Sequence, residues 1–207
     1  MSDQNRSDKF LRWASFIVDA FLLIAIGSYT IVAWEQWKEM KLDRRAWVAV
    51  NAVKGMPEAG KPFIVTVVIT NTGKTFAKNI DVVATESTVR NGELPDFANG
   101  IREAAKMRDP KLISHFLLAP GAFTEQTLES RETKSLSDNY ITNLKNGNPR
   151  FFVYGQVTYT DIFNHPHWLT FCTYLNFNPS QPEGLQWSYV NYQKYNDTGP
   201  GQPPWRY

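Results

Sequence analysis

The feature that most constrains this chain is a nearly uniformly apolar stretch close to its N-terminus. Residues 13–34 read WASFIVDAFLLIAIGSYTIVAW, and Asp19 is the one charged residue among them. At a rise of 1.5 Å per residue this stretch makes a helix of about 33 Å, which matches a hydrocarbon core of about 30 Å. Trp13 and Trp34 stand at its ends, where aromatic residues concentrate in membrane helices. The sequence therefore predicts a single transmembrane helix over residues 13–34, after an N-terminal tail of residues 1–12.

Two alternative interpretations of this stretch fit the sequence less well. A cleaved signal peptide has an apolar core of about 7 to 15 residues before its cleavage site, whereas here the apolar residues continue to Trp34. A helix in the core of a soluble domain is seldom apolar on every face. Basic residues flank the stretch in similar numbers and leave its orientation open: Arg6, Lys9 and Arg12 before it, and Lys38, Lys41, Arg44 and Arg45 after it.

Asp19 is the exception within the apolar stretch. An aspartate at the centre of a membrane helix costs about 2.5 to 3.5 kcal/mol, and this cost falls toward the headgroups, where Asp19 lies. On a period of 3.6 residues, Ser15, Asp19 and Thr30 share one face of the helix. This face predicts a hydrogen-bonded contact with a partner helix. The alternative is an Asp19 that is solvated at the interface and has no partner, and the sequence does not decide between the two.

The hydrophobic pattern changes its period after the apolar stretch. Residues 35–45 contain no Gly or Pro and predict a helical stalk. From Ala46 onward, β-branched and aromatic runs alternate with turn residues, which is typical of an antiparallel sandwich. The fold class that we predict is mainly β: an immunoglobulin-like antiparallel β-sandwich over residues 46–178, preceded by the transmembrane helix. A content of 43% hydrophobic, 14% aromatic and 20% charged residues fits such a folded domain.

The individual elements follow from alternation and turn residues. We expect residues 62–71 to be a central strand because both of its faces are apolar. The final hairpin, 150–163 with 167–177, is the clearest element and turns at the sequence NHP. The other expected elements are strands in 46–53, 76–90 and 112–130, a helical stretch at 100–107 within a polar insertion over 91–111, and a short helix before Gly147.

The last segment, residues 179–207, is an aromatic and Pro-rich C-terminal tail. Residues 185–192 are a candidate edge strand, and GPGQPPWRY at the end is expected to be irregular. The tail is too short to bury its aromatic residues by itself, so they either pack on the sheet or dock another molecule. The candidate partner-docking aromatics are Trp187, Tyr189, Tyr192 and Trp205.

Residues that suggest a metal or catalytic site do not converge. His165 and His167 flank a proline, and Cys172, an odd number of residues beyond His167 on a strand, faces the opposite side of the sheet. With His115 as the only further histidine, zinc lacks its usual four ligands. Cys172 is expected to be a buried, inert thiol. No hydrolase, nucleotide-binding or zinc-protease motif occurs. We therefore predict no metal, no cofactor, no catalytic residue and no enzyme.

Two stretches carry a resemblance to a known group. NTGKTFAKNI (71–80) and YGQVTYTDIFNHPHWLTFC (154–172) resemble segments of uncharacterised bacterial single-pass membrane proteins with an N-terminal helix and one β-sandwich domain. The resemblance implies a bacterial envelope protein and no catalysis. In physical terms, Asn71, Gly73 and Thr75 are turn residues, and Asp161 is expected to brace the NHP loop by accepting hydrogen bonds from backbone amides.

These observations favour an interaction or assembly module in the bacterial inner membrane. A net charge of +2 excludes an argument for nucleic acid, so the expected partners are the lipid bilayer and another protein or a second copy. We place the soluble domain on the periplasmic side, because a short tail before a larger exported domain is a common arrangement. The alternative is a ligand-binding or enzymatic domain with a pocket bordered by residues 91–111. A third possibility is a helix that acts through Asp19, with the sandwich as a sensor.

Overall fold

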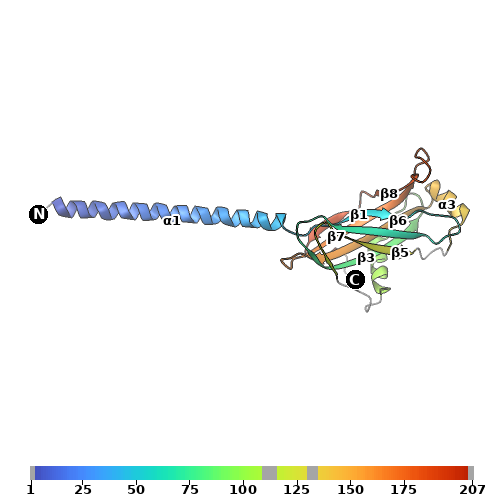
Figure 1. Ribbon diagram of the computed structural model, residues 1–207, viewed down its shortest axis with the longest axis horizontal. Helices are drawn as coiled ribbons and strands as arrows, with labels where there is room; N and C mark the ends of the chain where they lie inside the picture. The colour runs from blue at the N-terminus through green and yellow to red at the C-terminus, as the bar shows by residue number, and fades with distance from the viewer. Residues whose placement is uncertain (1–2, 109–115, 130–134, 205–207) are drawn as a thin grey trace. The chain divides into compact units, whose positions relative to one another are not determined.

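The structure is a computed structural model that describes residues 3–108, 116–129 and 135–204. Within the N-terminal helix, the side chains of 3–12, 14, 15 and 41–43 are not part of this description. The chain divides into two compact units, Met1–Arg44 and Arg45–Tyr207. The first unit is helical and the second is mainly β, as the change of hydrophobic period predicts (Figure 1).

The N-terminal unit is one continuous α-helix, α1 (Asp3–Asp43). The helix therefore begins before the predicted span and continues beyond Trp34 through most of the expected stalk. Its segment Phe16–Met40 is long and apolar enough to cross a membrane, and its side chains are not buried by the protein. A core helix of a soluble domain would be buried, whereas a signal sequence near an N-terminus can also be long and apolar enough to meet this criterion.

The β domain contains two antiparallel sheets. The smaller sheet has the strand order β1 (Val48–Lys54), β2 (Ile64–Asn71) and β5 (Phe123–Glu129). β2 is its central strand, in agreement with the two apolar faces seen in the sequence. The larger sheet has six strands, of which five follow the order β4-β3-β6-β7-β8 and the sixth, β9 (Asp197–Pro200), pairs with β7. The five are β3 (Ala77–Val89), β4 (Phe116–Leu118), β6 (Arg150–Thr160), β7 (Pro166–Phe177) and β8 (Trp187–Asn191).

The two sheets share one hydrophobic core. Within it, Phe63, which directly precedes β2, and Phe151 of β6 lie with their ring centroids 4.6 Å apart. A second cluster lies on the other face of the large sheet, where α2 (Phe97–Lys106) covers β3 and β6. α2 begins three residues before the expected stretch, because the Asp96 side chain accepts from the Asn99 amide and caps its first turn. The short helix α3 (Asp138–Lys145) is followed by Gly147 at φ 70°, as predicted.

The β6–β7 hairpin forms in the expected place, but β6 is shorter than predicted. The strand ends at Thr160 rather than at residue 163, because the next residue, Asp161, turns the chain. The Asp161 carbonyl accepts from the Asn164 amide at 3.0 Å, and its own amide donates to the His165 carbonyl at 3.1 Å. These bonds close a tight loop over residues 161–165.

The prediction of an irregular C-terminal end is wrong for part of that segment. Residues Asp197–Pro200 form a further strand, β9, which pairs with the start of β7 while β8 pairs with its end. Gly199 makes this possible: a Cβ there would lie 2.8 Å from the Trp168 ring. Pro200 is tolerated because β9 is an edge strand. Two short parts of the predicted tail, β8 and β9, thus belong to the large sheet.

Candidate functional site

A groove with a cavity runs along one edge of β3. β3 has 13 residues, but its outer neighbour β4 has only three and pairs with it at Ala77 and Ile80 alone. On its inner side β3 pairs with β6 as far as Val89. Among the described residues, no strand therefore pairs with the outer edge of β3 from residue 82 to residue 89.

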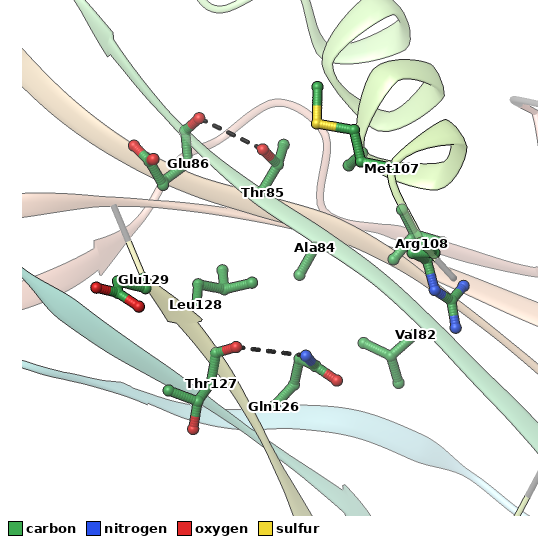
Figure 2. A pocket seen from close by; sticks show the side chains of 12 residues that line it. Val82, Ala84, Thr85, Glu86, Met107, Arg108, Gln126, Thr127, Leu128 and Glu129 are labelled. Carbon is green, nitrogen blue, oxygen red and sulfur yellow. Dashed lines mark hydrogen bonds between the residues drawn. The ribbon is translucent and has the colours of Figure 1, made fainter. Parts of the chain in front are cut away.

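The far wall of this groove is a second strand edge. β5 pairs with β2 along its whole length and, within the described part of the chain, with no other strand. The two edges enclose a cavity of about 240 Å³ and a smaller one of about 90 Å³ toward Ile80. Figure 2 shows Leu128 of β5 and Ala84 and Val82 of β3 in the space between the strands. We refer to this space, between residues 80–86 and 124–129, as the edge cleft.

The end of α2 forms the third wall of the edge cleft. Met107, which is 61% exposed, and Arg108 follow the helix directly and line the cavity. Arg108 is held in place by Asp81, with 2.5 Å between Nη2 and Oδ1, and both side chains are largely shielded from water. This ion pair fixes the end of α2 against the first part of the β3 edge.

The local sequence explains why α2 lies on the large sheet. Phe97, Ile101 and Ala104 form its buried face at helical spacing. Gly100 lies against Tyr154 so closely that a Cβ there would collide with the phenol hydroxyl. Burial is the largest cause that raises the pKa of Tyr154 to about 12, so its hydroxyl stays protonated beneath the helix. The close approach at Gly100 brings the end of α2 next to the β3 edge.

The polar groups at the cleft differ between its two ends. Arg108 lies near Asp81, and two acidic side chains, Glu86 and Glu129, lie at the other end, as Figure 2 shows. Gln126 extends between β5 and Val82, and its Nε2 atom donates to the Thr127 carbonyl at 3.4 Å. A ligand of the edge cleft thus meets two strand backbones, a small apolar floor and a carboxylate pair.

Asp161 braces the loop between β6 and β7 by accepting hydrogen bonds from backbone amides, as the sequence predicts. The side chain is 2% exposed, and its Oδ1 atom accepts from the amides of Phe163 at 2.8 Å and His165 at 2.9 Å. The His167 ring donates to Oδ2 at 3.0 Å and stacks on Tyr159. Burial acts to raise the pKa of Asp161, but the hydrogen bonds outweigh it and lower the pKa below its ordinary value. These contacts brace the loop that joins β6 to β7.

The candidate metal and thiol residues do not come together. His167 lies on the face of β7 that points into the core between the sheets, and Cys172 lies in the cluster beneath α2. No group of three or more His, Cys, Asp or Glu side chains that could hold a metal occurs in 3–108, 116–129 and 135–204, and His115 lies outside these ranges. Burial raises the pKa of Cys172 to about 12, so its thiol is protonated at neutral pH.

Asn71, Gly73 and Thr75 form the turn that the sequence predicts. Asn71 is fully buried, and its Nδ2 atom donates to the carbonyls of Thr75 at 2.7 Å and Leu118 at 2.9 Å. Its Oδ1 atom accepts from the Gly73 amide at 3.0 Å. A Cβ at Gly73 would collide with the backbone near Trp47. Together with a bond from the Trp47 amide to Oδ1 at 3.3 Å, this one buried side chain therefore joins three segments of the domain.

Three of the four candidate docking aromatics pack on the large sheet. Trp187 contacts Phe177 at a centroid distance of 4.9 Å, and Tyr192 contacts Phe152 at 5.6 Å. Tyr189 is half-buried against the main core. Trp205 lies outside the described residues. Docking of a partner by these rings stays a prediction, although the packing of three of them on their own sheet accounts for their presence.

The candidate helix-contact residues lie on α1. Asp19 is exposed on the helix surface. The Thr30 hydroxyl donates to the Ile26 carbonyl of its own helix at 2.8 Å, which leaves its oxygen as an acceptor for a partner. The side chain of Ser15 lies outside the described part of the chain. The predicted helix–helix contact therefore stays a prediction.

Sequence reasoning missed most of the edge cleft. It anticipated a pocket at residues 91–111, and Met107 and Arg108 do border the cleft. It did not anticipate Ala84, Gln126 or Leu128, which come from two strands that lie far apart in the sequence. One signal of an unpaired strand edge was available in the sequence: the predicted strand 76–90 has fifteen residues, whereas the apolar run at 116–118 has only three.

The fold defines a class of protein: one apolar N-terminal helix is followed in the sequence by a mainly β domain of two antiparallel sheets. Within that class, the chain belongs to the family described as Domain of unknown function (DUF8453), which matches residues 11–178. The matched range includes every described residue of the edge cleft and ends just after β7, so β8 and β9 lie beyond it. A search of curated proteins gave no match to the chain.

Proposed function

We propose that this protein is a membrane-anchored, immunoglobulin-like module of the bacterial envelope that holds an extended segment of another protein in the edge cleft. The segment adds to the outer edge of β3 as a further strand. The module has no catalytic role. It acts in assembly or tethering, with α1 as its single span of the inner membrane and the β domain on the periplasmic side.

One observation carries this proposal: over the described chain no strand pairs with the outer edge of β3 from residue 82 to residue 89, and residues 82–86 of this edge face a groove. Unpaired strand edges bind extended peptides through main-chain hydrogen bonds, and pockets beside the edge select the side chains. Natural proteins usually protect such edges, because an exposed one pairs with other chains. At about 3.3 Å per residue, residues 82–86 offer about 13 Å of edge within the cavity.

The side chains around the cleft indicate what the bound segment looks like. Successive residues of a strand point to opposite faces. The side chains on one face of the bound segment would meet the small apolar floor at Ala84 and Leu128, which suits Ala, Val or Thr. The side chains on its other face would meet Met107. The carboxylates of Glu86 and Glu129 favour a basic residue at that end of the segment, since opposite charges attract most strongly where water is partly excluded.

Site-directed photo-crosslinking in native membranes tests this proposal. A benzophenone amino acid at Gln126, which projects into the cleft, should link to a partner polypeptide, and mass spectrometry would identify the linked segment. The same substitution at Gln193, an exposed loop residue away from the cleft, is the matched control. Capture at 126 of a segment that has no strand propensity, or equal capture at both positions, would contradict strand addition.

Hydrogen exchange then tests the binding mode. A synthetic peptide of the linked segment should slow exchange of the amides of residues 82–89 in the full-length protein. Gln126→Trp, which fills the groove, should abolish this protection, and Gln193→Trp should leave it intact. A peptide that binds without slowing these amides would show that the β3 edge is not the site.

A second candidate function is the binding of a small ligand. It is favoured because Met107 and Arg108, from the end of α2, line one side of the cavity. A volume of about 240 Å³ is slightly below the usual range for such sites, about 300–1,000 Å³. Native mass spectrometry of the purified protein would show a bound small molecule directly. Such a ligand would protect Arg108 from chemical modification without slowing the amide exchange of residues 82–89.

A further inference from the structure

The exposed aromatic side chains of the β domain gather at one end. Within its described residues the domain exposes three of them: Trp47 by 40%, Phe76 by 44% and Phe123 by 63%. All three surround the turn at Asn71. The Trp47 amide donates to Asn71 Oδ1 at 3.3 Å, and Asn71 also bonds to the carbonyls that precede Phe76 and Phe123, at 2.7 and 3.0 Å. We call this surface the aromatic end.

Two further apolar side chains extend the aromatic end. Leu117, which is 57% exposed, precedes the residue of β4 whose carbonyl accepts from Asn71. Ile162, which is 39% exposed, lies in the loop that Asp161 braces, and Lys78 joins that loop to the start of β3 through Asn164 at 2.8 Å. The patch therefore continues across the ends of both sheets.

Charge distinguishes the aromatic end from the opposite end. In its loops, residues 45–47, 72–76, 119–122 and 161–165, the Lys and Arg residues are Arg45 and Lys74. The one carboxylate of these loops, Asp161, is buried and bonded internally. The described loops of the opposite end, 55–63, 90–96 and 178–186, have more acidic than basic residues: Glu58, Glu93, Asp96 and Glu183 against Lys61 and Arg90.

We propose that the aromatic end of the β domain docks onto the headgroup region of an anionic lipid bilayer. Exposed Trp and Phe side chains insert at the boundary between headgroups and acyl chains, and each Lys or Arg near an anionic surface adds to the attraction. Arg45 contributes to both effects, because its guanidinium lies 3.7 Å from the centre of the Trp47 ring.

The position of this end along the chain favours lipid over any other occupant. The apolar segment of α1 ends at Met40, and the β domain begins at Arg45. Five residue steps reach about 18 Å at most. The loop that contains Trp47 thus stays within reach of the membrane surface if α1 is the anchor, so the inference rests on that part of the proposed function. It is independent of what binds the edge cleft.

Depth-dependent quenching of a fluorescent label tests the inference in the full-length protein. Thr72→Cys places the label at the aromatic end, and Gln181→Cys places it in the loop between β7 and β8 as a control; both positions are exposed. Cys172 is buried and stays unlabelled. In nanodiscs of phosphatidylcholine and phosphatidylglycerol, nitroxide-bearing lipids should quench the label at 72 and leave the label at 181 unchanged.

Matched variants separate docking from simple proximity. Phe76→Ser with Phe123→Ser should reduce quenching at 72 to the level seen at 181. Ile64→Ser with Leu185→Ser removes apolar side chains of similar exposure at other parts of the surface and should change nothing. Lys74→Gln should lower the ratio of docked to free domain about fivefold in anionic nanodiscs and leave it unchanged in purely zwitterionic ones.

Three results would overturn the inference. Equal quenching at 72 and 181 would show that the domain has no preferred lipid-facing end. Quenching at 72 that survives the double Phe variant would show that tethering alone places the label near lipid. Shielding of the label at 72 that appears only when a second copy or another protein is added would assign the aromatic end to a protein partner. None of these outcomes changes the crosslinking at Gln126, so the two proposals fail separately.

Discussion

Asp161 offers the sharpest test of how the β domain is held together. Its carboxylate is 2% exposed and accepts three hydrogen bonds, from the Phe163 and His165 amides and from the His167 ring. A hydrogen bond to a charged group contributes about 1.5–3 kcal/mol. The two amides belong to a loop that water can reach. We therefore expect Asp161→Ala, which removes three such bonds, to lower the free energy of unfolding by about 3–5 kcal/mol, near the lower end of that range for each bond.

Asp161→Asn separates the charge from the shape of this side chain. The Asn oxygen still accepts from both backbone amides, but the amide nitrogen faces the His167 ring and the negative charge is lost. The expected loss is about 1.5–3 kcal/mol, or about 3–12 °C in the midpoint of a thermal melt for a domain of this size. Urea unfolding of the full chain in detergent, followed by tryptophan fluorescence, measures both variants against Glu183→Gln, an exposed carboxylate.

The pH dependence gives the same prediction an independent check. The pKa of Asp161 is lowered from its ordinary value of 3.8, so the folded state favours the charged form. Its stabilising contribution is complete above pH 3.8 and is lost as the pH falls through the folded pKa. The stability difference between the wild-type protein and Asp161→Asn should therefore shrink in acid. A difference that is constant from neutral pH to pH 3, or an Asn variant as stable as the wild type, would refute this account.

Three further predictions follow from single contacts. Gly155→Ala should lower the stability by about 1–3 kcal/mol in the same urea assay, because a Cβ would collide with the Phe171 ring and lie 2.7 Å from the Val83 carbonyl oxygen; an unchanged midpoint would contradict that packing. Asn71→Ala should cost about 3 kcal/mol or more, since it leaves several buried backbone groups without partners, and near-native stability would argue against the role of that turn. Cys172 should react with a maleimide at pH 8 only after unfolding, because it is buried and its pKa is about 12; rapid labelling of the folded protein would contradict this.

Local patterns in the sequence predicted the elements whose formation depends on near neighbours. The long helix, the central strand β2, the β6–β7 hairpin and the turn at Asn71 all follow from periodicity, turn residues and length. The role of Asp161 was predictable for the same reason, because the amides that it binds are two and four residues away. The end of β6 was misplaced by three residues, since apolar residues continue through Ile162 and Phe163 past the point where Asp161 turns the chain.

The strand β9 illustrates what local patterns miss. A segment with Gly and Pro predicts irregular backbone. Gly199 instead lets the strand lie against the Trp168 ring, and Pro200 is harmless on an edge. The formation of β9 therefore depends on its contact with Trp168, which lies about thirty residues earlier in the chain.

The sequence by itself determined that this protein has one apolar helix followed by a mainly β domain, because length, hydropathy and alternation are properties of consecutive residues. The positions of the two surfaces that we propose to be functional, in contrast, depend on the tertiary structure. Among the described residues, the edge cleft exists because β4 covers only the start of β3 and α2 ends beside it, and the aromatic end exists because the segments at Trp47, Phe76 and Phe123 meet around Asn71. Alternation records which face of a strand is buried, but not which strand lies beside it. For that reason an open strand edge and a shared end of two sheets are visible only once distant segments are brought together.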